Sequence, residues 1–566
     1  MARSVEIVLR TKEIAKTAQS VKMLKAIIKE RSGIAIKTNN AEFKIVLELK
    51  QGIGSEGFTI KKSGNSAVEI SGNDEKGLLY GVGKFLMTSR YEKWDFIPSI
   101  WQGTSVPEKK VRAMYFATHF HNFYHDAPVK EVVKYVEELA LYGCNILLVW
   151  FDMHHFKGLN DPEAQKMIKR LKIILKAAND TGMDAALGGV SNEGYSTTPE
   201  NVKAEWKVQN GYFEPPADHY HVEICPNKSG GIELIGKLRL EMLKAFKDLN
   251  IKYFFLWPYD QGGCTCEKCS PWGVKGHLLS SREAAKQIKK VFPLCKIILS
   301  TWYFDHFVGG EWAGLEKAFD RKELKWVDYF LMDDNYGFPE YPIKHKLHKK
   351  MKIVGFPEIS MKDMAPWGGF GANPRPVHFG KYWNTVKNFY DGSFPYSEGI
   401  FEDINKYIIL QMEWSQKRKI RDIVKEYVSF FFSPDTAAGA GKAVYLLEKN
   451  MKHRLTSSAG DDTGFRKKLY RLEAVDKKAV ECYKIVKDIE KQLPAYARKT
   501  WRWKIFYLRA ALDLELFRSK GKATRNSEKY FKELSKIYHA KNGRRSVRPP
   551  DIACLKKYWR PGSTGV

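Results

Sequence analysis

The feature that most constrains this chain is a repeated alternation of short apolar runs with longer amphipathic stretches between residues 110 and 415. Most of the apolar runs are followed by a segment with helical periodicity. In order, they are VRAMYFATH, NILLVWFDM, MDAALGGV, IKYFFLWPYD, KIILSTWYFD, WVDYFLMDD, KIVGFPEISM and GSFPYSEG. Continuously apolar strands are typical of a parallel sheet that is covered on both faces, and eight βα units suit a closed barrel. The expected fold class is therefore α/β, with a (β/α)8 TIM barrel over residues 106–415.

The segments on either side of the predicted barrel have different patterns. Residues 1–105 contain strand signals such as SVEIVLR and FKIVLELK and an amphipathic helix signal, VKMLKAIIKERSG. This mixture predicts a small α+β accessory domain. Residues 416–566 show helical periodicity without strand alternation, which predicts an α-helical C-terminal domain with a basic tail. The helically spaced Trp501, Trp503, Phe506 and Tyr507 are expected in the core of that domain.

The net charge of +29 admits two interpretations. One is an acidic partner, such as a uronic or sulfated glycan. The other, which we favour, is dispersed surface charge, because lysines occur on helix faces along the whole chain. No nucleic-acid-binding motif accompanies the charge, so no nucleic-acid partner is expected. The aromatic content of 13% favours a carbohydrate-binding site, since aromatic faces serve as platforms for sugar rings.

The start of the sequence, MARSVEIVLRTKEIAK, lacks the apolar core of a secretion signal, and no apolar stretch is long enough to cross a bilayer. We therefore expect no membrane association and a cytoplasmic location, or an extracytoplasmic one if a leader preceded this sequence. Eight cysteines in so long a chain do not indicate a disulfide scaffold. Homo-oligomerisation stays open.

The predicted strand ends are rich in carboxylates and aromatic residues. Chemistry in such barrels lies at the C-terminal ends of the strands. Seven of the eight ends carry an Asp or Glu, more than a purely structural rim requires. The residues expected to act there in catalysis or substrate contact are His119, His121, Trp150, Asp152, Asn192, Glu193, Trp257, Tyr259, Asp260, Gln261, Trp302, Asp333, Asp334, Glu358, Tyr396 and Glu398. The carboxylate at the fifth strand end is Asp305.

Paired carboxylates across an aromatic-walled pocket are what glycoside hydrolysis requires. One carboxylic acid protonates the leaving oxygen, and the second acts as a nucleophile or activates water. The catalytic candidates are Asp260, Glu358, Asp333, Asp334 and Glu398; of the adjacent pair Asp333 and Asp334, only one can face the barrel axis if the strand continues. Trp150, Trp257 and Trp302 are expected to be sugar platforms. His119 and His121 share a strand face and could contact a sugar hydroxyl, a carboxylate or a metal.

Four cysteines form a candidate metal site. Cys264, Cys266 and Cys269 have the CxCxxC spacing of zinc thiolate ligands, and Cys225 in the preceding loop could be a fourth. A structural zinc at this position would hold two loops together. The alternative is four reduced loop cysteines.

The segment VEISGNDEKGLLYGVGKFL, residues 68–86, resembles the end of the accessory domain that precedes the barrel in bacterial β-hexosaminidases and α-glucuronidases. In hexosaminidases, an Asp-Glu pair ends strand four, with Glu as the general acid and Asp as the residue that orients the substrate. The matching pair here is Asp260-Gln261, and glutamine cannot act as an acid. In α-glucuronidases, the acid lies at strand four and candidate bases follow strands six and seven. The resemblance therefore implies Asp260 with Asp333 or Asp334 and Glu358.

Two further residues resemble a known arrangement. Asn192-Glu193 is similar to the Asn-Glu sequence that carries the acid of retaining barrel glycosidases, although it follows the third predicted strand and not the fourth.

The expected function is a glycoside hydrolase without a required cofactor, acting on an oligosaccharide or polysaccharide fragment. Two alternatives are a carbohydrate-binding barrel that has lost catalysis, consistent with Gln261, and a zinc-dependent hydrolase that uses the cysteine or histidine clusters. The sugar, the linkage, exo or endo action and the stereochemistry stay open.

Overall fold

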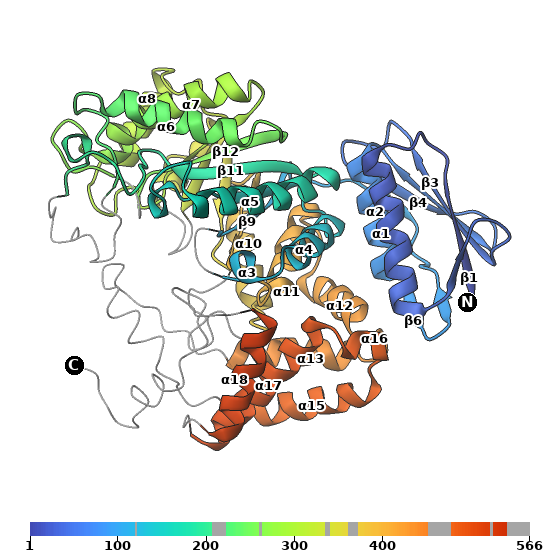
Figure 1. The fold of residues 1–566 in the computed structure, drawn as a ribbon. Coiled ribbons are helices and arrows are strands. Elements are labelled where there is room, and N and C mark those ends of the chain that lie inside the picture. Colours follow the sequence, from blue (N-terminus) through green and yellow to red (C-terminus); the bar gives the residue numbers. More distant parts are fainter. Residues whose placement is uncertain are drawn as a thin grey trace.

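The structure, a computed structural model, describes residues 1–118, 122–206, 222–259, 263–333, 340–359, 372–450, 477–520 and 524–539 (Figure 1). Five of the gaps follow strands of the barrel, namely β9 (Val111–Phe116), β11 (Asp184–Val190), β12 (Ile251–Trp257), β14 (Tyr329–Asp333) and β15 (Ile353–Phe356). Among the described helices, none is both long and apolar enough to cross a membrane.

The N-terminal part is a mixed sheet with two helices. Its six-stranded sheet has the order β2-β1-β3-β5-β4-β8. The strands are β1 (Ser4–Leu9), β2 (Ala35–Lys37), β3 (Phe43–Leu49), β4 (Phe58–Lys62), β5 (Ala67–Gly72) and β8 (Gly103–Ser105), with a separate hairpin of β6 (Arg90–Glu92) and β7 (Asp95–Ile97). The helices are α1 (Ala15–Ser32) and α2 (Glu75–Thr88).

The segment GLLYGVG, residues 77–83, lies on α2, and its glycines permit close packing. Asp74 caps the helix by accepting a hydrogen bond from the Gly77 backbone N–H at 2.8 Å. A Cβ atom at Gly77 would lie 2.2 Å from the carbonyl oxygen of Gly57, and one at Gly83 would lie 2.3 Å from that of Leu141. Leu141 belongs to the barrel, so this helix joins the N-terminal sheet to the barrel at backbone contact distance.

A closed barrel of parallel strands follows, as the sequence predicts. The order is β10-β11-β12-β13-β14-β15-β16-β9-β17, and the pairing of β10 with β9 closes the sheet. The strands are β9 (Val111–Phe116), β10 (Ile146–Trp150), β11 (Asp184–Val190), β12 (Ile251–Trp257), β13 (Lys296–Ser300), β14 (Tyr329–Asp333), β15 (Ile353–Phe356) and an eighth strand in two pieces, β16 (Gly392–Ser393) and β17 (Tyr396–Ser397). Pro395, which has no N–H to donate, lies between the two pieces.

Helices cover the outside of the barrel (Figure 1). The α-helices are α3 (Phe123–Asp126), α4 (Val129–Leu141), α5 (Pro162–Asp180), α6 (Gly231–Ala245), α7 (Gly276–Val291), α8 (Glu311–Asp320), α9 (Glu340–Lys344), α10 (Pro376–Val386) and α11 (Asp403–Trp414). Short 3₁₀ helices are η1 (Met153–His155), η2 (Glu200–Val202), η3 (Trp272–Val274) and η4 (Leu347–Lys349).

The C-terminal part is helical. It contains α12 (Ile420–Phe431), α13 (Ala437–Asn450), α15 (Lys478–Gln492), α16 (Ala495–Arg498), α17 (Trp501–Arg518) and α18 (Arg525–Ile537). Trp503 and Phe506 are buried, while Trp501 and Tyr507 are half-buried. The Arg502 guanidinium of α17 is buried and pairs with Asp403 of α11 at 2.7 Å. A buried ion pair therefore joins the helical part to the barrel.

Candidate active site

The C-terminal ends of the barrel strands bring most of the predicted site residues to one end of the barrel. Five of those residues, His119, His121, Asp260, Gln261 and Asp334, lie outside the described residues.

Two predicted catalytic carboxylates meet at Tyr396. The Tyr396 hydroxyl donates a hydrogen bond to Glu398 Oε1 at 2.6 Å, and the Glu398 side chain is fully buried. The backbone of Glu358 forms a parallel bridge with that of Tyr396. Burial, followed by the nearby charges of Glu398 and Glu358, raises the pKa of Tyr396 well above its usual value. Strands seven and eight thus bring two carboxylates to one tyrosine.

Asp333 ends β14, the strand next to β15. It is half-buried, and its backbone register partner is Phe356 at the end of β15. Glu358 follows Phe356 by two residues. Three carboxylates, Asp333, Glu358 and Glu398, therefore belong to consecutive strand ends of the barrel.

A buried polar network holds the chain on both sides of Glu398. The Ser397 hydroxyl donates to Glu402, and the Lys406 ammonium donates to the Gly399 carbonyl at 2.5 Å. Lys406 also lies 3.1 Å from Glu402 Oε1 and donates to the Tyr124 hydroxyl at 2.9 Å. Burial lowers the pKa of Lys406 and raises that of Glu402. The two neighbours of Glu398 are fixed by charged groups that solvent does not reach.

Glu193 binds the loop after β10. Its Oε1 atom accepts from the Met153 backbone N–H at 2.9 Å and lies 2.8 Å from His154 Nδ1. In the same loop, His155 Nδ1 lies 2.9 Å from Asp152 Oδ2. Glu193 and Asp152 are buried, so both carboxylates contribute to holding this rim in place.

Asn192 joins a distant part of its own loop, between β11 and α6, to the loop after β12. Its Nδ2 atom donates to the carbonyls of Ile224 at 3.0 Å and Gly263 at 2.9 Å, and its Oδ1 accepts from the Gly263 N–H at 3.2 Å. Gly263 directly follows the segment 260–262 that contains Asp260. This asparagine is therefore a positioning residue for the chain that leaves the fourth strand.

The chain that enters the same segment is also held. The Trp272 indole N–H donates to the Pro258 carbonyl at 2.7 Å, and the Tyr259 hydroxyl donates to Glu311 Oε1 at 2.5 Å. Glu311 also accepts from the backbone N–H groups of Gly273 at 2.6 Å and Asp305 at 3.0 Å. Contacts thus anchor the chain on both sides of residues 260–262.

Glu311 is a buried carboxylate that the sequence analysis did not single out. Burial raises its pKa to about 7. The adjacent Tyr303 and Asp305 have φ angles of 59° and 61°, in the left-handed region where non-glycine residues are uncommon. In the sequence, Glu311 follows Gly309-Gly310 at the start of a helix and does not lie at a strand end. Strand-end position therefore could not identify it.

The three predicted tryptophan platforms form one aromatic cluster. Trp257 stacks on Trp302 with ring centroids 4.9 Å apart, and Trp150 meets Trp257 edge-on at 6.1 Å. Each is less than a tenth exposed. Tyr115 links the cluster to the carboxylates, because it stacks on Trp150 and meets Tyr396 edge-on at 5.4 Å. The tryptophans therefore lie near Tyr396 and its neighbouring carboxylates in the barrel interior.

The four predicted metal ligands converge. The ligand atoms of Cys225, Cys264, Cys266 and Cys269 all lie within 4.8 Å of one another. This cluster lies at the same end of the barrel, between the loop after β11 and the loop after β12.

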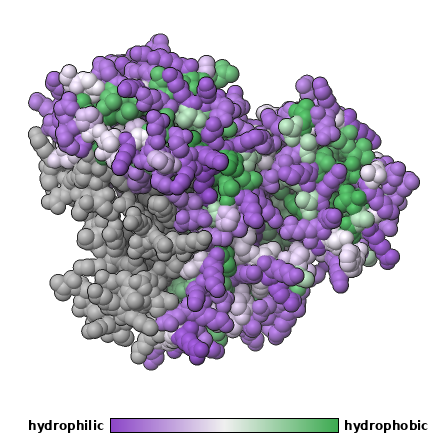
Figure 2. Space-filling view, viewed as in Figure 1, coloured by the Kyte–Doolittle hydropathy of each residue, from purple (hydrophilic) through white to green (hydrophobic). Residues whose placement is uncertain are grey.

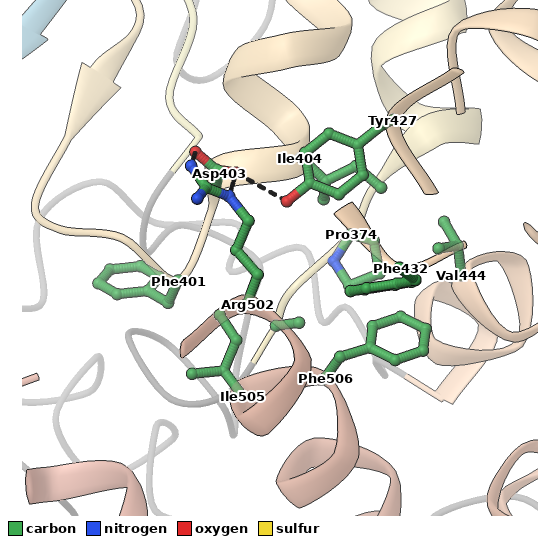
Figure 3. A pocket seen from close by; sticks show the side chains of 11 residues that line it. Pro374, Phe401, Asp403, Ile404, Tyr427, Phe432, Val444, Arg502, Ile505 and Phe506 are labelled. Carbon is green, nitrogen blue, oxygen red and sulfur yellow. Dashed lines mark hydrogen bonds and ion pairs between the residues drawn. The ribbon is translucent and has the colours of Figure 1, made fainter. Parts of the chain in front are cut away.

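A small cavity lies between the segment before α10, the start of α11 and the C-terminal helices (Figure 3). Asp403, paired with Arg502 and hydrogen-bonded by the Tyr427 hydroxyl at 2.7 Å, forms part of its wall. Its volume of about 20 Å³ accommodates roughly one water molecule. It is too small to hold a sugar ring.

No family model and no curated protein matches the sequence. Solved structures match over nearly the whole chain. The chain shares its fold with glycoside hydrolases. A GH115 4-O-methyl-α-glucuronidase, described as specific for decorated arabinogalactans, has a TM-score of 0.59 at 10% identity, over 98% of this chain and 79% of that one. A GH138 enzyme targeting pectin rhamnogalacturonan II has a TM-score of 0.57 at 13% identity, over 98% of this chain and 78% of that one.

A third solved structure covers less of the chain. The GH20 exo-β-N-acetylglucosaminidase of Vibrio harveyi has a TM-score of 0.53 at 11% identity, over 79% of this chain and 75% of that one. At such low identities the structural likeness shows a common fold alone, so the activity has to be argued from the site.

Proposed function

We propose that this chain is a glycoside hydrolase that uses paired carboxylates at the C-terminal ends of its barrel strands. The observation that carries the proposal is the approach of Glu358 and Glu398 to the single side chain of Tyr396. Asp333 ends the neighbouring strand, and a tryptophan cluster adjoins the group. Carboxylates beside aromatic rings in a barrel mouth are what glycosidic bond cleavage requires.

The proposed roles follow from the position of each carboxylate. Asp260 is the proton donor or the residue that orients the substrate, because it follows the fourth strand and the chain is anchored on both sides of it. Glu358, or one of Asp333 and Asp334, is the partner that activates water or attacks the anomeric carbon. The acid protonates the leaving oxygen as its bond to the anomeric carbon breaks, and water supplies the new hydroxyl and returns a proton. Glu398 is the further candidate for either role.

The substrate class that we favour is an acidic glycan. The names of two fold neighbours support it, a 4-O-methyl-α-glucuronidase and an enzyme that targets pectin rhamnogalacturonan II. The net charge of +29, although dispersed over the chain, is compatible with an anionic substrate. Gln261 replaces the acid of hexosaminidase chemistry, so the α-glucuronidase layout suits these residues better than the hexosaminidase layout. In this proposal, the carboxylates carry out the reaction and no cofactor takes part in it.

The test is a hydrolysis screen of the full chain against a glycan library that includes uronic-acid, amino-sugar and sulfated oligosaccharides, with detection of the released anomer. On the substrate that is found, the Asp260→Asn and Glu358→Gln variants should each lose about 10²–10⁴-fold in kcat/KM, the contribution of a general acid or base. Circular dichroism should show the same fold for both variants.

The matched control is Glu163→Gln, which removes a solvent-exposed carboxylate at the start of α5 and should leave kcat/KM unchanged. Full turnover by both folded active-site variants would refute the assignment. Glycan binding without any release of reducing sugar would favour the non-catalytic binding barrel. Activity that disappears on chelation, while both carboxylate variants stay active, would favour a zinc-dependent hydrolase.

A further inference from the structure

The four cysteines come from two loops that are about 40 residues apart in the sequence. Cys225 belongs to the loop between β11 and α6, and the other three belong to the loop between β12 and η3. Cys225, Cys264 and Cys269 are buried, and Cys266 is half-buried. Clustering four thiols, three of them buried, does not stabilise the fold unless they share a partner. The arrangement therefore requires an explanation.

The sulfur spacing matches one tetrahedral metal ion. Cys225 Sγ lies 3.8 Å from Cys266 Sγ and 3.7 Å from Cys269 Sγ. Four Zn–S bonds of about 2.3 Å in a tetrahedron place their sulfur atoms about 3.8 Å apart. A disulfide would require about 2.05 Å. We propose that Cys225, Cys264, Cys266 and Cys269 bind one Zn²⁺ ion through four thiolates.

The groups around the sulfurs fit thiolate ligands. Asn227 Nδ2 donates to Cys269 Sγ at 3.1 Å, and the Glu205 backbone N–H donates to Cys264 Sγ at 3.4 Å. Donors of this kind stabilise negative charge on sulfur and orient the ligand. The Cys266 carbonyl accepts from the N–H groups of both Cys269 and Ser270 at 2.9 Å. That tight turn fixes the separation of Cys266 and Cys269 independently of any metal.

Four protein ligands leave no open coordination position, so this ion is structural and does not activate water. Its effect is mechanical. It joins the loop after β11 to the loop after β12, the same two loops that Asn192 bridges at Ile224 and Gly263. Gly263 and Cys264 directly follow residues 260–262, so the metal fixes the exit of the segment that contains Asp260. The metal site itself does not depend on the proposed hydrolase activity.

The first test is metal analysis of the purified full chain by inductively coupled plasma mass spectrometry. We expect one zinc per chain in the wild type, and loss of zinc in Cys266→Ser and in Cys269→Ser. The matched control is Cys295→Ser, which alters another buried free cysteine outside the cluster and should keep the zinc. Iron in place of zinc, no metal above the buffer blank, or disulfides among the four cysteines would overturn the proposal.

The second test needs no variant and therefore cannot fail through misfolding of one. A strong chelator should lower the Tm of the wild type by several degrees, and zinc should restore it. Hydrogen exchange should increase in residues 222–233 and 263–276 on chelation and stay unchanged in the N-terminal sheet. Replacement of zinc by Co²⁺ should give the thiolate charge-transfer absorption of a tetrahedral site. An unchanged Tm and unchanged exchange after chelation, in a protein shown to be free of metal, would contradict a structural role.

Discussion

Glu311 shows what burial does to a single carboxyl group at the rim of this barrel. It accepts hydrogen bonds from one tyrosine hydroxyl and two backbone N–H groups, and burial nevertheless raises its pKa to about 7. Between about pH 4.5 and 7, this carboxyl is protonated in the folded chain and ionised in the unfolded chain. The folded state then binds more protons, so the contribution of Glu311 to stability falls as pH rises through this window.

This shift predicts the pH dependence of a Glu311→Gln variant. The variant loses hydrogen bonds at every pH, but it has no carboxylate to bury. The destabilisation of the variant relative to the wild type should therefore be larger at pH 5 than at pH 8, by about 2–3 kcal/mol at ~1.4 kcal/mol per pKa unit. Urea unfolding at the two pH values measures this difference. Equal destabilisation at both would contradict the raised pKa, and Glu163→Gln, exposed on α5, should show no such difference.

The site residues show which part of a site a sequence can predict. Strand-end position identified Asn192, Glu193 and Tyr259 as rim residues, and they are at the rim. Their partners are loop backbone groups, a histidine and Glu311, between 32 and 71 residues away in the chain. A pattern of spacing has no information about such partners. The roles in substrate contact predicted for these residues remain predictions.

At the scale of elements, the strands were predictable and their ends were less so. All eight barrel strands fall within the runs picked out in the sequence, and most of these runs are apolar because a strand buried on both faces carries few polar side chains. The eighth run was predicted as one strand and is two pieces, separated where Pro395 supplies no N–H. The docking of α17 on the barrel was not predictable, because Arg502 appears in the sequence as an ordinary helix-face arginine.

That docking gives the prediction at this scale. Arg502 of α17 pairs with Asp403 and with Glu138 of α4, both at 2.7 Å, and Asp403 also accepts from the hydroxyls of Tyr135 and Tyr427. Arg502→Met would leave the buried Asp403 without its cation, which should cost about 3–5 kcal/mol of stability. Chemical denaturation measures the loss.

The control on the same helix is Lys504→Met, which alters an exposed cation and should change stability by less than about 0.5 kcal/mol. Adding Asp403→Asn to Arg502→Met should recover part of the loss, because the uncompensated charge is then removed. Similar stability of the Arg502 and Lys504 variants would show that the buried pair does not hold the helices to the barrel.

At the scale of the whole molecule, charge is the property that the fold leaves unexplained. Ion pairs join the N-terminal sheet to the barrel, with Glu56 bound to Arg112 and Lys76 lying 3.2 Å from Asp184. Even if every acidic residue were paired with one basic residue, 29 basic residues would remain. The face shown in Figure 2 is mostly hydrophilic, with small separate hydrophobic areas. Dispersed cations on such a surface raise the local concentration of any anionic substrate.

The excess charge therefore predicts a salt response that depends on the substrate. For an oligosaccharide with uronic-acid groups, kcat/KM should fall about tenfold or more between 0.1 M and 1 M salt, as the screening length shrinks from about 10 Å to about 3 Å. A neutral oligosaccharide that the chain also hydrolyses, or binds, should respond little over the same range. Steady-state kinetics, or binding titrations where turnover is slow, measure both. An equal response of the acidic and the neutral compound would show that the excess positive charge does not attract the substrate.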